Sequence, residues 1–332
     1  MIRWAHAINH FKPNFDDFAR RRDHLRALRI VSISGFSGVE LTAGTGRWEP
    51  LGNPEQVAAN FGDLGGFAAF VREAGLDGVS SWFWDPMTAF REDLLPGSDP
   101  AGASSRPVLL ERARWFARAL AELGGDVLVA RPAVSAWQRP DLDDDDIAVM
   151  AETWNAVGDA IAEDGIRLGL HFDFLSALRV GDGLERLIAE TDPRHVGLTL
   201  DTGELTIAGR DPHDFLRRHA DRVVLVHLKN VGAVDDVPEY TVRNAEHHVR
   251  RAGGSRGIPR WYLELDAPSP LVDSRRFVTE LARQGYDGWV VVESELSPHP
   301  PTTTMLNGWQ LQHVLTPAVA REQNGADAHE RS

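Results

Sequence analysis

The stretch Val223-Val224-Leu225-Val226-His227-Leu228-Lys229-Asn230 joins an apolar run directly to an imidazole, an ammonium and an amide. An apolar run of this length is typical of a parallel strand that is covered on both faces. The same arrangement precedes Asp201, in residues 196–201, and Glu293, in residues 289–293. Three buried strands are therefore predicted to end in polar side chains.

Eight segments of strand length alternate with helical segments along the chain. They are predicted at residues 2–9, 33–41, 75–84, 126–132, 166–173, 195–200, 223–230 and 289–293. Such alternation predicts parallel strands joined by right-handed crossovers. The count of eight favours an α/β fold that closes into a (β/α)8 barrel over an open sheet.

We expect a single barrel domain at residues 1–316, interrupted after the seventh strand by a polar, glycine-containing insertion at about residues 231–260. The polar stretch at residues 317–332 is predicted to be a partly disordered C-terminal tail.

Composition limits the classes of function. The 332 residues include no cysteine, so a metal site would have to use histidine and carboxylate ligands. The net charge of -14 is spread along the chain and argues against a nucleic-acid partner. No apolar run approaches the roughly 18 residues of a membrane span, and the N-terminus lacks the long apolar segment of a signal peptide. A cytoplasmic protein with a small-molecule substrate and no membrane partner is expected.

The ends of strands five to eight carry the candidate metal ligands His171, Asp201, His227 and Glu293. In a closed barrel all strands end at one face, where residues distant in sequence converge. Asp173 is an alternative to His171, because residues two apart point to the same side of a strand. Nitrogen and carboxylate ligands suit manganese, iron, cobalt, zinc or magnesium. The alternative is that each is an ordinary polar group at a strand end.

Further candidates lie near the same face. Lys229 is one of two lysines in a chain whose other cations are arginines, and an ammonium differs from a guanidinium in pKa and geometry. Trp82 and Trp84 end the third strand and are candidates for stacking on a sugar ring, with core packing as the alternative. His10 and Glu40 are candidate substrate contacts, with hydrogen-bonded polar groups of the barrel mouth as the alternative.

Several short motifs together resemble the xylose-isomerase-like TIM-barrel superfamily of sugar isomerases and epimerases. They are Gly38-Val39-Glu40-Leu41, Asp201-Thr202-Gly203, His227-Leu228-Lys229-Asn230 and Gly285-Tyr286-Asp287-Gly288-Trp289 with Val292-Glu293. Residues 191–205 are particularly similar to inosose dehydratases, which eliminate water from a keto-cyclitol.

The resemblance implies a divalent metal, commonly manganese, held by Glu, Asp, His and Glu at the ends of strands five to eight; cobalt, magnesium, iron and zinc are alternatives. Asp201, His227 and Glu293 match that pattern by position. His171 stands where the first glutamate is expected. Glu204 stands where the motif Asp-Thr-Gly-His has its histidine.

The chemistry implied is proton abstraction next to a carbonyl, with Lys229, Glu204 and His171 as the catalytic candidates. Elimination from the enolate would make the protein a metal-dependent lyase of keto-sugars, keto-glycosides or keto-cyclitols; reprotonation would make it an isomerase or epimerase. The unusual His171 and Glu204 leave open a non-catalytic sugar-binding or structural subunit. The segment after strand seven resembles that of C-glycoside deglycosidase α subunits, so a homo-oligomer or a small second subunit is compatible with the sequence.

Overall fold

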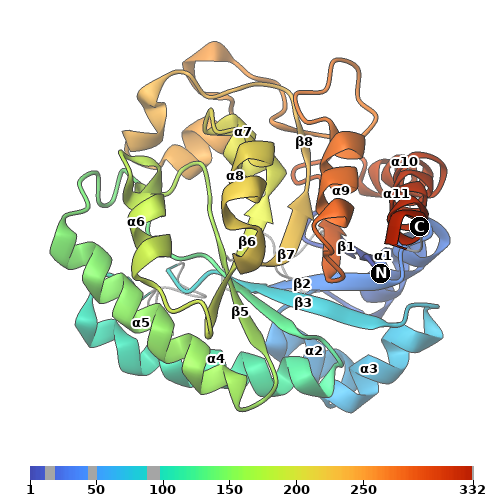
Figure 1. Cartoon of the computed structure of the whole chain (residues 1–332). Helices are drawn as coiled ribbons and strands as arrows, with labels where there is room; N and C mark the ends of the chain where they lie inside the picture. Colours follow the sequence, from blue (N-terminus) through green and yellow to red (C-terminus); the bar gives the residue numbers. More distant parts are fainter. Residues whose placement is uncertain (12–18, 44–50, 88–97, 331–332) are drawn as a thin grey trace.

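A computed structural model describes residues 1–11, 19–43, 51–87 and 98–330, with the backbone alone for residues 324–330. Eight parallel strands close into a barrel in the order β1-β10-β7-β6-β5-β4-β3-β2 (Figure 1). They are β1 (Arg3–Ala7), β2 (Gly38–Ala43), β3 (Gly78–Trp84), β4 (Val127–Ala130), β5 (Arg167–His171), β6 (Val196–Asp201), β7 (Val223–Leu228) and β10 (Trp289–Val292). The predicted single-domain (β/α)8 barrel is confirmed.

The register of the strands determines which residues share the mouth of the barrel. On one side of β7, His227 pairs with Asp201 of β6, and on the other side it pairs with Val291 of β10. The barrel closes where β1 pairs with both β10 and β2. Because all the strands are parallel, their C-terminal ends open on the same face.

Helices surround the barrel in the described part of the chain (Figure 1). They are α1 (Arg21–Ile33), α2 (Pro54–Phe61), α3 (Leu64–Glu73), α4 (Arg106–Glu122), α5 (Asp144–Ala162), α6 (Gly183–Glu190), α7 (Thr202–Ile207), α8 (Pro212–His219), α9 (Ser274–Arg283), α10 (Pro300–Gln310) and α11 (Thr316–Glu330). Asp211 caps α8 with its side chain, and Pro212 occupies the first position, where its missing N–H costs nothing.

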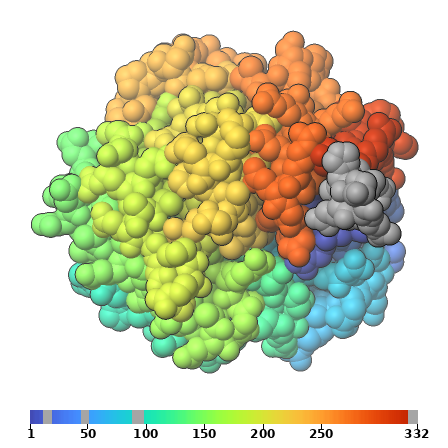
Figure 2. Space-filling view, viewed as in Figure 1, coloured from blue at the N-terminus to red at the C-terminus, as the bar shows by residue number. Residues whose placement is uncertain are grey.

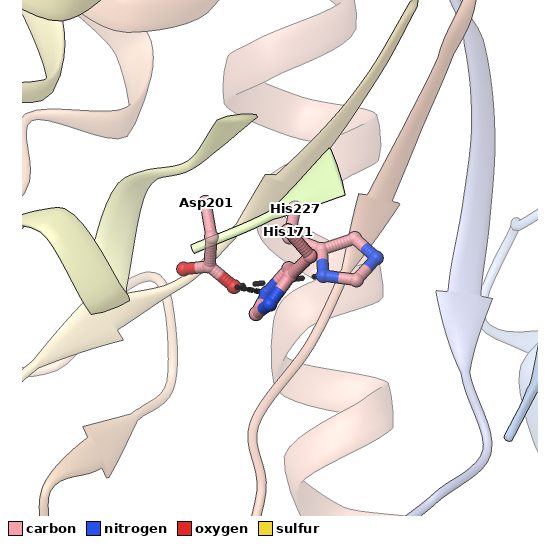
Figure 3. Close-up of side chains that lie close together, drawn as sticks. All are labelled: His171, Asp201 and His227. Carbon is pink, nitrogen blue, oxygen red and sulfur yellow. Dashed lines mark hydrogen bonds and ion pairs between the residues drawn. The ribbon is translucent and has the colours of Figure 1, made fainter. Parts of the chain in front are cut away.

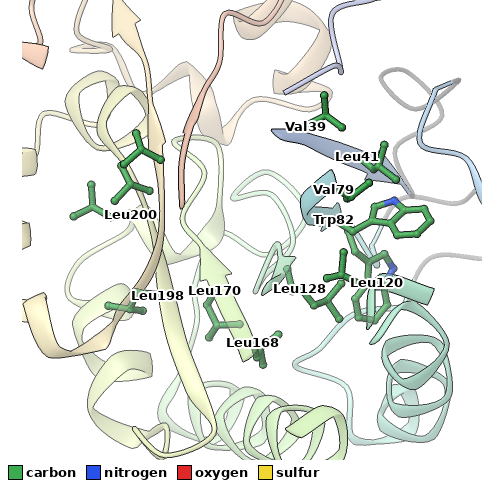
Figure 4. Packing of buried hydrophobic residues seen from close by; sticks show 14 of the residues in the cluster. Val39, Leu41, Val79, Trp82, Leu120, Leu128, Leu168, Leu170, Leu198 and Leu200 are labelled. Atoms are coloured by element: carbon green, nitrogen blue, oxygen red, sulfur yellow. The ribbon is translucent and has the colours of Figure 1, made fainter. Parts of the chain in front are cut away.

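Two apolar layers hold the barrel together. Leu128, Leu168, Leu198 and their neighbours point outward and form the large core against the helices (Figure 4). A smaller cluster that includes residues of β1, β4, β7 and β10 forms a second layer; its buried members are Ala5, Ala7, Val127, Val129, Leu225, Trp289 and Val291. On β7 and β10 the alternate positions that follow this cluster are His227 and Glu293, so apolar packing gives way to polar groups toward the mouth.

The segment after β7 folds onto the mouth of the barrel. It begins with β8 (Asn230–Val231), which pairs antiparallel with β9 (Tyr262–Leu263). Between them lie the short helices η4 (Pro238–Thr241), η5 (Glu246–Arg251) and η6 (Gly254–Arg256). A separate apolar cluster packs this segment against the chain that follows β5 and β6; its buried members are Phe174, Leu175, Ile207, Val231, Ala245, Val249, Trp261, Tyr262 and Val272. In the space-filling view the segment forms the upper rim of the molecule (Figure 2).

The partial disorder of residues 317–332 stays a prediction. The structure describes helix α11 through Glu330, and Arg283 of α9 pairs with Glu322 of α11. Helix α11 packs beside α9. Among the described residues no helix has the length and apolarity that a membrane span requires.

Candidate active site

Polar side chains converge where the inward-facing positions of the strands reach the mouth. They follow the two-residue alternation of each strand and are all buried. The set consists of Asn9, Glu40, Asp85, Arg131, His171, Asp173, Asp201, His227, Lys229, Glu293 and Glu295. The convergence of distant residues that the barrel topology predicted is therefore present.

Three of the predicted ligands lie together at the ends of β5, β6 and β7 (Figure 3). His171 Nε2 is 3.0 Å from Asp201 Oδ2, and His227 Nδ1 is 3.5 Å from the same oxygen. One ligand atom from each of the three residues lies within 4.8 Å of the other two. The structure brings His171 to this group, whereas Asp173 faces two arginines.

Glu293, directly after β10, supplies a fourth candidate ligand atom, a carboxylate oxygen. Its Oε2 lies 3.4 Å from His227 Nδ1, while Asn9 donates a hydrogen bond to Oε1. Within the described part of the chain, neither Glu293 Oε2 nor His227 Nδ1 has a hydrogen-bond partner of regular geometry. Buried polar atoms usually make at least one hydrogen bond, so these two are exceptions that call for an explanation. Two imidazoles and two carboxylates in this arrangement fit a divalent cation.

Glu40 determines which nitrogen of His227 faces the mouth. Its Oε2 lies 3.0 Å from His227 Nε2 and accepts a hydrogen bond of 2.8 Å from Ser81 Oγ. With Nε2 directed to this carboxylate, Nδ1 is directed to Asp201 and Glu293. Carboxylates commonly hold metal-ligating histidines in this way. Glu40, predicted as a substrate contact, thus lies behind His227 and is fully buried.

Asp201 is oriented by the helix that follows it. Its Oδ1 accepts hydrogen bonds from the backbone N–H groups of Gly203 and Glu204 at 2.8 and 2.9 Å, which leaves Oδ2 for the site. Burial raises the pKa of Asp201, but Lys229 and the two imidazoles outweigh it and hold that pKa well below its usual value. Gly203 is required here because a Cβ would lie 2.8 Å from Lys229 Cβ.

Lys229 lies among four carboxylates. Its Nζ is 3.0 Å from Asp201, 2.9 Å from Glu293, 3.0 Å from Glu295 and 3.3 Å from Glu204. Burial lowers the pKa of Lys229, but the surrounding carboxylates outweigh it and hold that pKa well above its ordinary value. Lys229 is therefore a fixed positive charge inside the site.

Glu204 is held by donors from three different segments. Its Oε1 accepts hydrogen bonds from Tyr262 Oη at 2.7 Å and Lys229 Nζ at 3.3 Å, and its Oε2 accepts one from the backbone N–H of Phe174 at 3.0 Å. Burial raises the pKa of Glu204, and the opposing charge of Lys229 does not cancel that effect. A fixed carboxylate with a raised pKa has the properties of a general base.

An arginine from the insertion reaches the same region. Arg250 of η5 pairs with Asp173 and lies 3.8 Å from Glu204 Oε2. Burial raises the pKa of Asp173, but Arg250 and Arg131 outweigh it and hold that pKa below its usual value. Arg131 also lies 3.8 Å from Glu246 Oε1 of η5. These ion pairs tie the insertion to the barrel mouth.

The placement of Trp82 and Trp84 favours the alternative of core packing over stacking on a sugar ring. Both indoles are buried in the outer core, where they pack against Phe116 of α4, and Trp82 Nε1 donates to the carbonyl of Gly52. Phe83, between them in sequence, faces inward instead, with its ring centroid 5.0 Å from that of His171. The alternation of side chains along a strand causes the difference.

His10 holds neighbouring segments together. Its Nδ1 is 3.0 Å from the carbonyl oxygen of Ser294, and its Nε2 is 3.3 Å from Thr304 Oγ1 of α10. Burial lowers its pKa to about 4, so the ring is neutral at pH 7. These contacts favour the alternative of a hydrogen-bonded polar group at the barrel mouth, and no contact joins His10 to the metal-ligand candidates in the described part of the chain.

Sequence reasoning missed Asn9, Glu295, Tyr262 and Arg250. Asn9 and Glu295 lie two residues beyond Ala7 and Glu293, so continuing the inward alternation past the strand ends would have found them. No comparable signal marks Tyr262 or Arg250, because an insertion without strand or helix periodicity does not indicate which residues face the barrel.

Comparison with known proteins agrees with this architecture. A family model described as xylose isomerase-like TIM barrel matches residues 28–309. An inosose dehydratase of Bacillus velezensis is 27% identical over 273 residues, which are 82% of this chain and 81% of that protein. An inosose dehydratase of Lacticaseibacillus casei is 28% identical over 161 residues, 48% of this chain and 51% of that protein. The chain thus spans about half the length of the first curated relatives that it matches.

Solved structures share the fold at low sequence identity. An L-ribulose 3-epimerase is 15% identical with a TM-score of 0.67, covering 99% of this chain and 98% of that one. A probable 3-DHS dehydratase of Bacillus anthracis is 12% identical with a TM-score of 0.67, covering 94% of this chain and 99% of that one. A 3-keto-D-glucoside 4-epimerase of E. coli is 17% identical with a TM-score of 0.59, covering 94% and 98%.

Proposed function

The chain belongs to the xylose isomerase-like TIM barrel family, and from this premise we propose that it is a metal-dependent lyase of a keto-sugar, keto-glycoside or keto-cyclitol. The observation that carries the proposal is the buried carboxylate of Glu204, fixed beside the ammonium of Lys229, which also contacts Asp201. A base beside a set of metal ligands suits proton abstraction next to a carbonyl. The similarity to an inosose dehydratase over 82% of the chain favours elimination as the outcome.

We assign His171, Asp201, His227 and Glu293 as the residues that hold the metal, with manganese as the first candidate and cobalt, magnesium, iron or zinc as alternatives. A divalent ion bound there would supply a Lewis acid for the substrate carbonyl. The proposal is supported by His227 Nδ1 and Glu293 Oε2, which make ion-pair contacts but no hydrogen bond of regular geometry within the described part of the chain, and by the Glu40 carboxylate behind His227.

Glu204 is the proposed base. Its carboxylate removes the proton from the carbon next to the carbonyl, the electron pair of that C–H bond forms a double bond to the carbonyl carbon, and the carbonyl π pair moves to the oxygen, which gives the enolate. The carbonyl then re-forms, and the electron pair of the enolate double bond forms the new carbon–carbon double bond to the neighbouring carbon. The bond from that carbon to its oxygen substituent breaks, and the oxygen leaves with the bonding pair. Glu204 returns the proton to the departing oxygen, so water or an alcohol leaves and the carboxylate is regenerated.

Lys229 and His171 assist this step. The Lys229 ammonium stabilises negative charge that develops on a substrate oxygen, in a site where burial strengthens electrostatic interactions. His171 Nδ1 has no hydrogen-bond partner in the described part of the chain, so it is available to a substrate hydroxyl while Nε2 faces Asp201. Tyr262 positions Glu204 through its hydrogen bond to Oε1.

A sugar epimerase or isomerase is the second candidate. The structural neighbours with that activity cover nearly the whole chain, and the same proton abstraction begins both reactions. The two reactions diverge once the enolate has formed: reprotonation at carbon gives an epimer, and loss of the neighbouring substituent gives the dehydrated product. A non-catalytic binding subunit, the third candidate, would bind no transition metal.

The test combines metal analysis with product detection. Purified protein incubated with Mn²⁺ and then desalted is expected to retain metal, whereas Asp201→Ala and Glu293→Ala are expected to retain much less. The loaded protein is then incubated in D₂O with an inosose, a 3-keto-glucoside and a ketohexose, and the products are followed by NMR. A dehydrated product supports the lyase; deuterium incorporation without elimination supports the epimerase. Equal metal content in all three proteins would contradict the metal assignment.

A further inference from the structure

Lys229 is the only lysine among the residues that the structure describes, and it shares oxygen atoms with the proposed metal site. Its Nζ lies 3.0 Å from Asp201 Oδ2 and 2.9 Å from Glu293 Oε2. These are the same two oxygens that lie 3.5 and 3.4 Å from His227 Nδ1. A metal ion that used both oxygens as ligands would therefore share these oxygens with the Lys229 ammonium.

The hydrogen bonds of Lys229 divide its four carboxylates into two pairs. An ammonium has three protons and cannot donate to four carboxylates at once. Hydrogen bonds of regular geometry run to Glu204 and Glu295, at 3.3 and 3.0 Å. The approaches to Asp201 and Glu293 are ion-pair contacts only, and Glu293 Oε2 has no hydrogen-bond partner in the described part of the chain.

The side chain of Lys229 is held in place. It is 1% exposed, and its Nζ lies 4.8 Å from the centroid of the Tyr262 ring. Its Cβ packs against Gly203, where an added Cβ would lie only 2.8 Å from it. Another buried cation, Arg250, lies 3.8 and 3.9 Å from Glu204 and Glu295. One ammonium thus faces four carboxylates, and the second cation lies beside Glu204 and Glu295 and not beside Asp201 and Glu293.

We propose that Lys229 competes with the metal for Asp201 and Glu293. When no metal is bound, Lys229 forms ion pairs with both carboxylates. When the metal binds their oxygens, Lys229 keeps its contacts with Glu204 and Glu295 only. The inference rests on the metal site of the proposed function. Two cations that share ligands in a buried site repel each other with little screening by salt. Lys229 therefore lowers the metal affinity of the site and keeps the metal-free site ordered.

Calorimetric titration of the metal-stripped full chain with Mn²⁺ tests the competition without any substrate. Lys229→Met is expected to bind Mn²⁺ at least about tenfold more tightly than the wild type. Tyr262→Phe is the matched control, because it removes the other hydrogen bond to Glu204 Oε1 but keeps the ammonium; it is expected to bind within about threefold of the wild type.

Thermal unfolding in EDTA provides a second readout. The metal-free Lys229→Met protein is expected to melt below the wild type, and added Mn²⁺ to raise its melting temperature by more than it raises that of the wild type. If Lys229→Met does not fold, the double variant Lys229→Met with Glu295→Gln, which removes one charge of each sign, takes its place with the same expectations.

The outcomes separate this inference from the proposed function. Wild-type binding of Mn²⁺ with equal or weaker binding by the lysine variant overturns the competition and leaves the metal site standing. No binding by the wild type but binding by the variant supports the competition in its strongest form. No binding by either protein overturns both the metal assignment and the competition.

Discussion

Glu40 is an example of a residue whose role depends on a single neighbour. It lies on β2, and its carboxylate joins Ser81 and His227 in the barrel interior. The hydrogen bond that Glu40 accepts from His227 Nε2 directs the other ring nitrogen to Asp201 and Glu293. Glu40, a candidate substrate contact in the sequence, is therefore placed to orient His227, one of the proposed metal ligands.

Replacing Glu40 by Gln tests this orienting role. The amide is nearly isosteric but neutral, so His227 loses a charged acceptor and some of its basicity. We expect Mn²⁺ affinity to fall by about 10- to 100-fold with the fold intact. Calorimetry measures the affinity, and circular dichroism checks the fold. Ser81→Ala, which removes the other partner of Glu40, is the control and should have a smaller effect; an affinity equal to wild type in Glu40→Gln would refute the role.

The single substitution Glu204→Gln tests whether Glu204 is the base. Glu204→Gln keeps the acceptor for Tyr262 and Lys229 but cannot accept a proton from carbon. On the substrate that the product screen identifies, turnover is expected to fall by about a hundredfold or more. Metal affinity should stay within a few-fold of wild type. Retained turnover, or retained exchange of the substrate C–H proton with D₂O, would show that another group is the base.

At the scale of elements, the strand ends and the insertion contribute different parts of the site. The ends of β5, β6, β7 and β10 carry the proposed ligands, whereas the segment from β8 to β9 supplies Tyr262, Arg250 and Glu246. Trp137, on the chain after β4, donates to Glu246 Oε2 at 2.8 Å. The insertion is thus a packed part of the barrel mouth, held by an apolar cluster and by buried ion pairs.

Arg250→Met tests how firmly the insertion is held. The substitution leaves Asp173 buried with Arg131 as its remaining cation, and removal of one partner from a buried ion pair costs about 3–5 kcal/mol. Faster hydrogen exchange is expected in residues 231–263, with little change in β1 to β5, as measured by mass spectrometry. The control is Arg243→Met, at an exposed arginine on the same segment. Equal exchange in the two variants would mean that the ion pairs do not hold the insertion.

At the scale of the whole molecule, the outer core of the barrel contains uncharged histidines. Burial and the neighbouring His10 lower the pKa of His6 to about 3, against the raising effect of its contact with the Ala7 carbonyl. Phe36 packs edge-on against the same ring. A histidine whose folded-state pKa lies below its unfolded value of 6.5 stabilises the fold above pH 6.5, and that contribution is lost as the pH falls toward 3.

The His6→Leu variant isolates this dependence. The free energy of unfolding is measured in urea, with EDTA present, at several pH values from 7.5 to 4. Between pH 6.5 and 4 the wild type is expected to lose stability relative to the variant by roughly 1 kcal/mol per pH unit. The exposed His313→Gln is the control and should run parallel to the wild type. A wild type that also runs parallel to His6→Leu would contradict the neutral buried state of His6.

The amino-acid sequence by itself determined the barrel and most of the metal-ligand candidates. Apolar strands alternating with helices allow few topologies, and a parallel barrel brings every strand end to one face. Asp201, His227 and Glu293 could therefore be found from strand ends alone. The choice of His171 over Asp173 required the structure, because both side chains point to the same side of β5 and only their neighbours distinguish them.

Tertiary structure alone decided the rest. The inward or outward direction of Trp82, Phe83 and Trp84 depends on the register of β3 in the barrel, since a shift by one residue would exchange the two faces. The approach of Tyr262 and Arg250 to Glu204 and Asp173 depends on how an irregular segment packs. The rarity of lysine singles out Lys229 in the sequence, but its place among four carboxylates is a property of the closed barrel, which brings together strand ends far apart in the chain.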